Sequence, residues 1–364
     1  MAPGRNTMPP LPLVRAVERF RAGLVFLHRK LVPSEIAVLE MMTAGWLAQA
    51  IAAAAELRIA DELAKGPRSA ADLATAVGAD EDALRRLLRL LISHGFFAED
   101  RDGRYRLNKT AQVLRGDSPV TLRDMALFVG SKLHRERWSQ LTDAVRTGRP
   151  IASGGAEFFE LAQTDREVGE LFDRAMASVN SIGREALLNA YDFSRYGVIV
   201  DVGGGTGMLL SEILRRTPGA RGVLLDLPQV VADVPDRLAE DGLAQRCEVV
   251  GGSFFESVPE GGDAYILQHI VHDWPEADLA RILGAVRAAM KSHSRLLLIE
   301  IVLPEHDRPH PGKYIDLEML VNVGGRERTV AEYRDLLARN GFTLEQVVPT
   351  VSPENILVAR QADG

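Results

Sequence analysis

The chain has 364 residues, 46% of them hydrophobic, and a formal net charge of −7 at pH 7, so it has room for two domains with a sizeable core. The negative charge gives no support to a nucleic acid or an anionic membrane as the main partner. A single cysteine, Cys247, excludes an internal disulfide and is compatible with the reducing cytoplasm.

The N-terminal segment is expected to be a flexible leader followed by a first helix. Residues 1–12 are rich in proline and lack the apolar core of a signal peptide. Residues 41–55 are uncharged and rich in alanine, but this run is short for a membrane span and is bracketed by Glu40 and Glu56. A buried helix is therefore predicted for residues 41–55, and no targeting or transmembrane element is expected.

Residues 46–107 predict helices followed by a small hairpin, which is a winged-helix pattern. Ser69 is positioned to cap one short helix, and residues 80–94 form the next, which Gly95 ends. An Asp102-Gly103 turn between two short apolar runs predicts the hairpin.

A winged helix invites a DNA-binding interpretation, in which Arg85, Arg86 and Arg89 contact phosphates or bases. The same arginines suit a solvated helix face, and the acidic residues 80–82 would repel phosphate. The solvated face is the preferred interpretation, and DNA binding stays an alternative.

Residues 110–188 have a helical pattern with breaks at residues 148–150 and 154–155. Phe172, Met176 and Asn180 recur every four residues and so share one helix face, while Trp138 belongs to an earlier helix. Simple core packing explains such a stripe. A pocket lining is the alternative, because this helix immediately precedes the glycine-rich segment described next.

The chain is organised around residues 198–208. Four β-branched residues around Asp201 predict a buried parallel strand, and helical spacing begins at Met208. The glycines between them allow a tight turn and close approach of a ligand. Their spacing does not match the dinucleotide-binding pattern, because Met208 stands where that pattern needs a small residue. The segment predicts a nucleotide-type crevice at the carboxyl end of a strand.

Downstream, strands and helices alternate as in an α/β sheet. Asp226 ends the second strand and lies one βαβ unit from the glycines, where ribose hydroxyls would need a bidentate acceptor. Further strands end at Ser253, at Gln268 and near Glu300. Two late strands, around residues 346–349 and 356–359, complete the sheet as an antiparallel edge.

The ordered motifs resemble those of S-adenosylmethionine-dependent small-molecule O-methyltransferases of the caffeate and acetylserotonin type, especially bacterial ones that act on aromatic natural products. The resemblance rests on the winged-helix pattern and on Asp201–Gly207, Leu225–Pro228, His272–Trp274, Glu300 and Gly324–Thr329. It implies a Rossmann-like class I methyltransferase domain of α/β type and an all-α, winged-helix dimerisation domain at the N-terminus.

The resemblance also implies a domain organisation. It assigns a leader and first helix to residues 1–30, a dimerisation domain to 31–110, a helical linker and substrate lid to 111–188, and the cofactor-binding catalytic domain to 189–364. A cytoplasmic homodimer joined through the N-terminal domain is expected, with no nucleic acid, membrane or metal as partner.

The family match further implies two sets of binding residues. Those expected at S-adenosylmethionine are Met176, Asn180, Gly203, Gly205, Asp226, Leu227, Ser253, Phe254 and Gln268. Those expected at the acceptor are Trp138, Phe172, Met176 and Asn322. Two residues depart from the family pattern: Ser253 stands where an aspartate is usual, and Gln268 stands where many plant relatives carry lysine.

His272 is the expected general base, because methyl transfer to oxygen requires removal of the hydroxyl proton. The resemblance places Glu300 and Glu327 on either side of it, where a carboxylate fixes the imidazole tautomer. A metal pair of His269 and His272 is not favoured, because no third ligand follows at a familiar spacing. Asp273 fits a helix N-cap, with Glu276 completing a capping box.

The predicted function is methyl transfer from S-adenosylmethionine to a hydroxyl of an aromatic small molecule such as a phenol, a hydroxyquinone or a polyketide-like compound. Two alternatives remain open. One is a relative that binds the cofactor but performs hydroxylation or decarboxylation. The other is a ligand-responsive protein that binds DNA through the winged helix. An apolar, planar pocket suits an aromatic ring but selects no particular acceptor.

Overall fold

The structure is a computed structural model that describes residues 9–151, 161 and 164–362, and the chain divides into two compact units. The helical unit comprises residues 19–141 and 159–182. The sheet unit comprises residues 1–18, 142–158 and 183–364. Three helices contribute residues to both units: α1 (Leu11–Lys30), α8 (Leu141–Thr147) and α10 (Arg166–Ala190).

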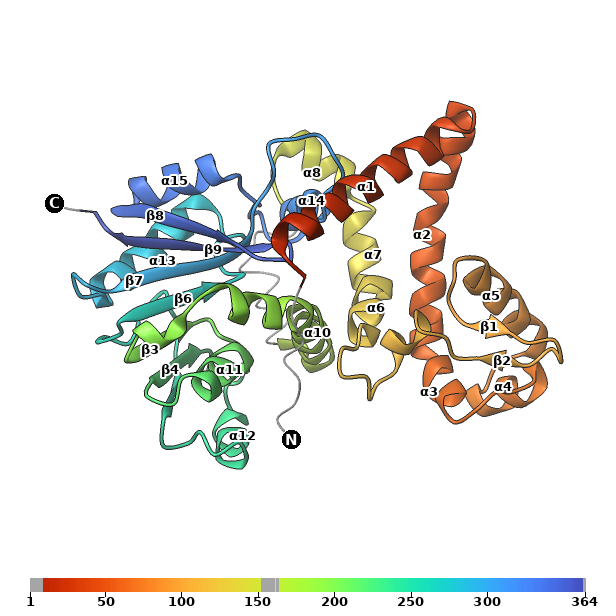
Figure 1. Cartoon of the computed structure of the whole chain (residues 1–364), viewed down its shortest axis with the longest axis horizontal. Helices are drawn as coiled ribbons and strands as arrows, with labels where there is room; N and C mark the ends of the chain where they lie inside the picture. The colour runs from red at the N-terminus through yellow and green to blue at the C-terminus, as the bar shows by residue number, and fades with distance from the viewer. Residues whose placement is uncertain (1–8, 152–160, 162–163, 363–364) are drawn as a thin grey trace. The chain divides into compact units, whose positions relative to one another are not determined.

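The helical unit is built on the long helix α2 (Ser34–Glu56), with shorter helices and a hairpin gathered along its C-terminal half (Figure 1). Leu84, Leu88 and Leu91 form one buried stripe, which belongs to the hydrophobic core of this unit. The other elements are α3 (Ile59–Ala64), α4 (Ala70–Val77), α5 (Glu81–Ser93), β1 (Ala98–Glu99), β2 (Tyr105–Arg106), η1 (Ala111–Leu114), α6 (Arg123–Gly130) and α7 (Lys132–Trp138).

The expected local signals of the helical unit are confirmed. The Ser69 hydroxyl accepts a hydrogen bond from the Asp72 amide, as expected of a cap. The next helix is present, but Asp80, expected to be its first residue, is instead its N-cap and accepts from the Ala83 amide. Gly95 follows α5 with a left-handed φ of 81°, a conformation that glycine adopts without strain. The hairpin pairs Ala98 with Arg106.

The expectation of a buried helix over residues 41–55 is wrong for its first half. The buried residues of α2 are all alanines, and four of the five lie between residues 50 and 55. Met42 and Trp46 are 70% and 72% exposed. The reason is that α2 is apolar around its circumference, whereas the small core of this unit covers only its C-terminal half. By length and composition alone α2 could also cross a membrane, a test that core helices of soluble proteins pass too.

The sheet unit holds a seven-stranded sheet in the order β5-β4-β3-β6-β7-β9-β8. The first five of these strands are mutually parallel, and β9 is antiparallel to both of its neighbours, which confirms the α/β fold with an antiparallel edge. The strands are β3 (Val198–Val202), β4 (Arg221–Asp226), β5 (Cys247–Gly251), β6 (Ala264–Gln268), β7 (Arg295–Ile301), β8 (Phe342–Pro349) and β9 (Glu354–Gln361).

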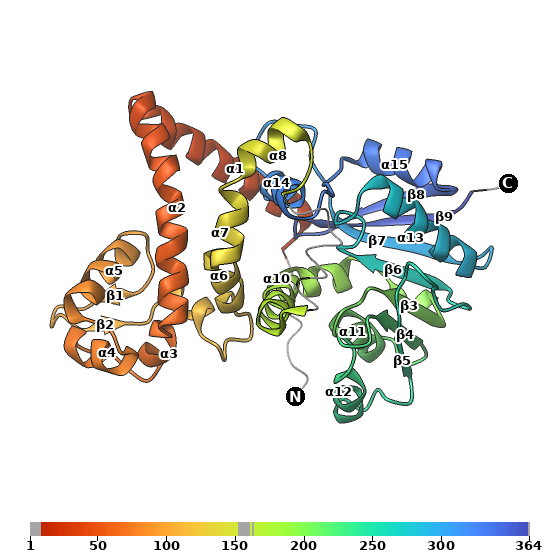
Figure 2. The ribbon, with the colours of Figure 1, turned by 180° about the vertical axis from the view of Figure 1, so that it is seen from behind.

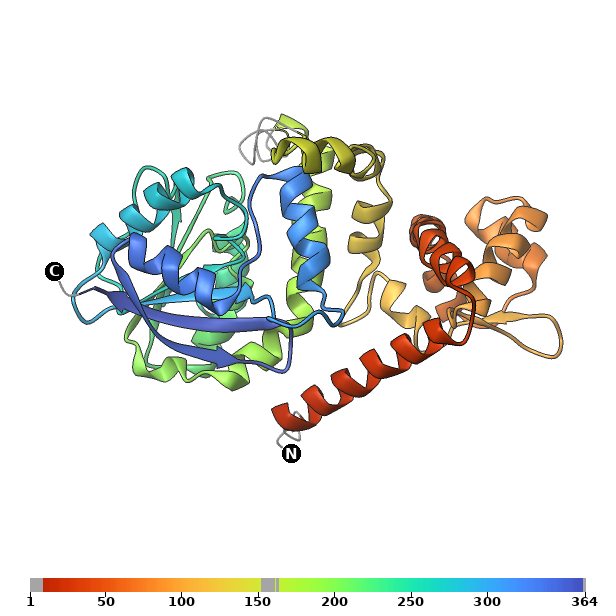
Figure 3. The same cartoon turned by 90° about the horizontal axis from the view of Figure 1, so that it is seen from above.

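Helices cover both faces of this sheet, with α11 and α12 on one side and α13 and α15 on the other (Figure 1 and Figure 2). Figure 3 shows α15 lying along the β8–β9 hairpin. Because both faces are covered, the central strands are apolar at nearly every position. The helices and turns are α8 (Leu141–Thr147), η2 (Phe193–Arg195), α11 (Met208–Arg216), α12 (Val234–Glu240), α13 (Glu276–Ala289), α14 (Gly312–Asn322) and α15 (Val330–Arg339).

The strand order reverses at β3, because the chain proceeds to β4 on one side of it and returns to β6 on the other. In open α/β sheets, ligands bind at the carboxyl ends of the strands beside such a reversal. The carboxyl ends of β3, β4 and β6 carry Gly203, Asp226 and Gln268, so the fold brings these residues to one edge.

Candidate active site

The turn from β3 to α11 is a glycine loop, and open space lies beside one of its glycines, Gly205. Gly203, Gly205 and Gly207 have φ values of 70°, 58° and 71°, which disfavour residues with a side chain. A Cβ at Gly203 would lie 2.6 Å from Ile270 Cδ1, whereas a Cβ at Gly205 would meet no atom within 4 Å. Gly203 is therefore needed for packing, and Gly205 leaves open space beside the backbone.

Asp226 holds the loop from the neighbouring strand. Its carboxylate accepts hydrogen bonds of 2.7 Å from the Gly205 amide and 2.7 Å from the Leu227 amide. Burial raises the pKa of Asp226, and these two hydrogen bonds act against that rise. Each carboxylate oxygen has more than one acceptor site, so both can still accept a ligand hydroxyl.

Asp201 lies beneath the loop as a buried carboxylate whose two oxygens have no hydrogen-bond partner among the described residues. A Cβ on Gly204 would stand 2.5 Å from one of them. Burial, together with the charge of Asp226, raises the pKa of Asp201 to about 7. Two buried acids beside an open glycine loop favour a ligand with positive charge, as a sulfonium cofactor has.

Ser253, Phe254 and Gln268 follow the neighbouring strands. The Ser253 hydroxyl accepts from the Phe255 amide, and the Phe254 ring meets the Trp274 ring edge-on at 6.0 Å. Gln268 ends β6 and hydrogen-bonds the Glu354 carboxylate. The glycine loop, Asp226 and these residues supply open space, acceptors and an aromatic wall, a set that fits a nucleoside-bearing cofactor with positive charge.

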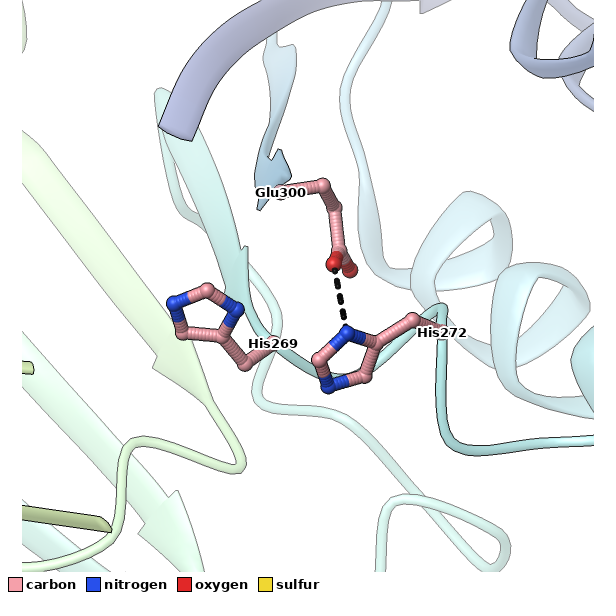
Figure 4. Close-up of side chains that lie close together, drawn as sticks. All are labelled: His269, His272 and Glu300. Atoms are coloured by element: carbon pink, nitrogen blue, oxygen red, sulfur yellow. Dashed lines mark ion pairs between the residues drawn. The ribbon is translucent and has the colours of Figure 1, made fainter. Parts of the chain in front are cut away.

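His272 is a buried imidazole in the loop between β6 and α13, surrounded by acids. Its Nδ1 lies 2.8 Å from Glu327 Oε1 and 3.6 Å from Glu300 Oε2 (Figure 4 draws the Glu300 contact). Asp273 Oδ1 is 3.4 Å from Nε2. The structure thus brings together the expected base and both expected carboxylates.

The backbone around His272 is held as firmly as its ring. Glu300 accepts a hydrogen bond from the Val271 amide at 2.8 Å, and Arg328 donates to the Val271 carbonyl at 3.2 Å. The Arg326 amide donates to the His272 carbonyl at 2.8 Å. A Cβ on Gly325 would lie 1.9 Å from that carbonyl oxygen, so only glycine fits there.

The acids around His272 are harder to ionise than usual. Burial raises the pKa of Glu327 to about 8, although the charge of His269 lowers it. Burial also raises the pKa of Asp273, to about 6, and it raises the pKa of Glu300. Carboxylates in so dry a setting interact strongly with any cation that forms beside them.

The expectation that Asp273 caps α13 is wrong. The N-cap position belongs to Pro275, and no side chain caps this helix. Asp273 is instead turned toward His272. The reason is tertiary: Arg326 and Arg328 hold the backbone carbonyls of His272 and Val271, and the Asp273 carboxylate lies beside the His272 ring.

The fold supplies a third potential metal ligand that the sequence spacing did not reveal. One nitrogen or oxygen atom of each of His269, His272 and Glu300 lies within 4.8 Å of the others. His272 Nδ1, however, already pairs with Glu327 at 2.8 Å, which is the geometry of an oriented base. Two other histidines of this unit serve elsewhere: His293 pairs with Asp263 at the surface, and His310 contacts the Gly312 amide.

The other predicted site residues are placed as follows. Trp138 lies in α7, and Phe172, Met176 and Asn180 share one face of α10, all in the helical unit. The Phe172 ring meets that of Phe128 edge-on at 5.9 Å. Asn322 ends α14 in the sheet unit and donates to Glu318. Their roles toward the cofactor or acceptor stay predictions.

Sequence reasoning missed three residues that shape this region. Asp201 and Gly325 belong to family motifs, but neither has a role of its own that the sequence predicts. Glu354, which hydrogen-bonds His269, follows it by 85 residues and carries no local signal.

Comparison with known proteins gives consistent matches. A model of the O-methyltransferase domain matches residues 138–343, and one of the O-methyltransferase dimerisation domain matches residues 39–117.

The phenazine O-methyltransferase PhzM of Lysobacter antibioticus is 40% identical over 331 residues, which cover 90% of this chain and 97% of that relative. The mitomycin biosynthesis 6-O-methyltransferase of Streptomyces lavendulae is 40% identical over 334 residues, covering 90% and 95%. The solved structure of CalO1, a methyltransferase in calicheamicin biosynthesis in its SAH-bound form, has a TM-score of 0.78 and 38% identity, covering 90% of this chain and 98% of that one.

Proposed function

Because this chain belongs to the S-adenosylmethionine-dependent O-methyltransferase family, we propose that it methylates a hydroxyl of an aromatic small molecule and that His272 is the general base. The observation that carries the proposal is the 2.8 Å contact between Glu327 and Nδ1 of the buried His272, with Glu300 behind it. An Nδ1–H that donates to Glu327 leaves Nε2 free to accept a proton.

The residues of the glycine loop fit the family's cofactor. When bound, S-adenosylmethionine supplies an electrophilic methyl group on a sulfonium. Gly203 and Gly205 would carry its methionine end, and Asp226 with Leu227 its ribose and adenine. Ser253, Phe254 and Gln268 would flank it from the neighbouring strands, and Met176 and Asn180 would contact it from α10. The two buried acids, Asp201 and Asp226, favour its positive charge.

The protein's chemical task is to orient the acceptor and take its proton. A new bond forms between the hydroxyl oxygen and the methyl carbon while the carbon–sulfur bond breaks, and the hydroxyl proton passes to His272 Nε2. The imidazolium that results is stabilised by Glu327 and Glu300 in a dry pocket. Solvent takes the proton when the product leaves.

We also propose that Trp138, Phe172, Met176 and Asn322 line the acceptor site. Three of these side chains are large and apolar or aromatic, which suits a planar ring. The PhzM relative is named for phenazine and the second relative for mitomycin biosynthesis, so a polycyclic, oxygen-bearing aromatic acceptor is the first class to screen.

The match to a dimerisation domain supports a homodimer, and we propose that α2 forms part of its interface. Its exposed apolar residues, among them Met42 and Trp46, need cover in water. We further propose a cytoplasmic protein without a nucleic-acid or membrane partner. Arg85 is already paired with Glu81 at 2.7 Å, which weakens the case for phosphate contacts.

Replacing His272 by alanine tests the role of the base. Cofactor binding measured by calorimetry should persist, while turnover of a phenolic acceptor should fall by about a hundredfold or more. His293→Ala, at the exposed His293–Asp263 pair, is the matched control and should leave both unchanged. Full turnover by the His272 variant, with an acceptor that is un-ionised at the assay pH, would contradict the proposal.

A further inference from the structure

A second histidine–glutamate pair lies directly beside the first. His269 Nε2 is 2.7 Å from Glu354 Oε1, and the His269 ring lies 5.3 Å from the His272 ring at an interplanar angle of 29°. Figure 4 shows one ring nitrogen of His269 turned toward Glu300 and His272 and the other turned away. His269 also has a left-handed φ of 53°, which is uncommon outside glycine and concentrates at functional sites.

The pair is held in place from three sides. Ser352 donates to the second carboxylate oxygen of Glu354 at 3.2 Å, and Gln268 hydrogen-bonds the same carboxylate. From α10, a Cβ on Gly183 would lie 2.3 Å from Glu354 Oε2, so a larger residue there would displace the carboxylate. So many fixed partners hold Glu354 in one orientation toward His269.

The charges around the pair favour an ion pair at neutral pH. Burial lowers the pKa of His269, but the hydrogen bond and charge of Glu354, with the charges of Glu300 and Glu327, outweigh it and raise the pKa to about 9. Burial raises the pKa of Glu354, and His269 more than reverses this, so Glu354 ionises readily. The loop between β6 and α13, which carries His272, is called the base loop. The charged and titratable groups that face the two rings are Glu354 on β9, Glu300 on β7, Glu327 and Arg328 after α14, Asp273 in the base loop and Arg184 on α10.

The acids around His272 work against its proposed role as a base, and the positive charge of His269 works against the effect of those acids. Three acidic groups, Glu300, Glu327 and Asp273, lie within 3.6 Å of the ring nitrogens of His272, and any of them that is ionised attracts positive charge to this ring. A histidine that is already protonated cannot accept the proton of the acceptor hydroxyl. A fixed positive charge stacked on the ring opposes that protonation.

We propose that His269, held by Glu354, is a positioning residue that acts through His272: it carries the positive charge that keeps the neighbouring base neutral until the acceptor binds. The inference rests on the proposed role of His272. Its second consequence is mechanical, because the stacked, hydrogen-bonded ring of His269 restricts the rotation of the His272 ring. When the His269–Glu354 ion pair is broken, His272 should lose both its neutral state and the restriction on its ring rotation.

Glu354→Gln tests the proposal, because the amide keeps the shape of the side chain and removes its charge. The acidic limb of the pH profile of kcat/KM should move to higher pH by about one unit, so that activity at pH 6 falls about tenfold while the high-pH plateau changes less than about twofold. A purely structural role would lower the rate equally at every pH. Glu345→Gln is the matched control, since Glu345 pairs with Arg295 at the start of β7, whereas Glu300 lies near the other end of that strand.

Two further variants keep the test decisive if Glu354→Gln folds poorly. His269→Asn removes the charge and tolerates a left-handed backbone, so it should shift the acidic limb as Glu354→Gln does. His269→Lys restores a cation, so its limb should stay near that of the wild type. If His269→Asn and His269→Lys shifted the acidic limb equally, the proposal would be overturned, because the shift would not depend on the charge at residue 269.

A readout independent of turnover separates this inference from the proposed function. Histidine-selective NMR of the whole protein follows the pH at which the His272 ring titrates, and that midpoint should rise in Glu354→Gln. An unchanged midpoint would overturn the role of His269 even if His272→Ala is inactive. A raised midpoint together with an active His272→Ala enzyme would leave the electrostatic coupling standing and overturn only the role of His272 as base.

Discussion

Glu327 and Glu300 approach the same nitrogen of His272 but act differently. Glu327 Oε1 is within hydrogen-bond distance of Nδ1, at 2.8 Å, and so fixes the tautomer of the ring. Glu300 stands farther away, at 3.6 Å, and uses its other oxygen to hold the Val271 amide. One acid therefore orients the ring and the other orients the loop that carries it.

Asp201 is expected to make the protein without cofactor less stable as the pH rises. Its folded pKa of about 7 lies above the unfolded value of 3.8, so the folded state binds more protons between these two values and stability falls as the pH rises through that window. Asp201→Asn should stabilise the cofactor-free protein by at most about 4 kcal/mol at pH 8 and by much less at pH 4.

Urea unfolding of the wild type and of Asp201→Asn at pH 4 and pH 8 measures the difference in their free energies of unfolding. The same variant should bind S-adenosylmethionine more weakly, because the amide carries no negative charge for the cation. Equal stabilisation at both pH values would show that the pKa of Asp201 is the same in the folded and the unfolded protein, contrary to this prediction.

Gly203 and Gly205 are expected to differ although both have a positive φ. Gly205→Ala meets open space, so it should cost about 1–2 kcal/mol of backbone strain and mainly weaken cofactor binding, by about tenfold, because its methyl group occupies the ligand's side of the loop. Gly203→Ala adds a collision with Ile270 Cδ1 and should unfold at lower temperature. Calorimetric titration and thermal melts of both variants decide between these effects, and identical behaviour would contradict the distinction.

At the scale of elements, the base loop and the segment after α14 pack backbone against backbone. Gly325→Ala would place a methyl group 1.9 Å from the His272 carbonyl oxygen, so one of the two segments must move. Because Arg326 and Arg328 hold the loop from this segment, the movement should misplace His272 and lower kcat by about tenfold or more while cofactor affinity changes little.

Gly284→Ala is the matched control for this prediction. Gly284 lies within α13, where an added Cβ meets nothing within 4 Å, so alanine should stabilise that helix by about 0.5–1 kcal/mol and leave kcat unchanged. Steady-state kinetics and melts of the two variants suffice. A Gly325→Ala enzyme with wild-type kcat would show that the two segments adapt without moving the base.

At the scale of the whole molecule, the exposed apolar half of α2 needs a partner surface. Trp46→Glu should weaken the proposed dimer by at least about 2 kcal/mol, because a buried tryptophan contributes about 150–250 Å² of contact area and a glutamate would be buried unpaired. Analytical ultracentrifugation should then show a shift toward monomer. Trp46→Phe keeps an apolar ring and should remain dimeric, and a Trp46→Glu protein that is still fully dimeric would place the interface elsewhere.

Local chemistry is what the sequence alone determined. The cap at Ser69, the buried strand before Gly203 and the turn at Gly205 follow from rules that act within a few residues. The alternation of strands and helices indicated the α/β fold, and family motifs named His272, Glu300 and Glu327.

Only the tertiary structure decided which distant groups meet. His269 and Glu354 are 85 residues apart, and nothing along the chain indicates that they pair. The pairing of His272 with Glu327, 55 residues apart, is expected only from the family motifs and not from any local rule. The same holds for the exposed half of α2 and for Asp273, whose local patterns suited a buried helix and a cap. Local patterns record what a segment can form, whereas burial and charge depend on what the fold packs against it.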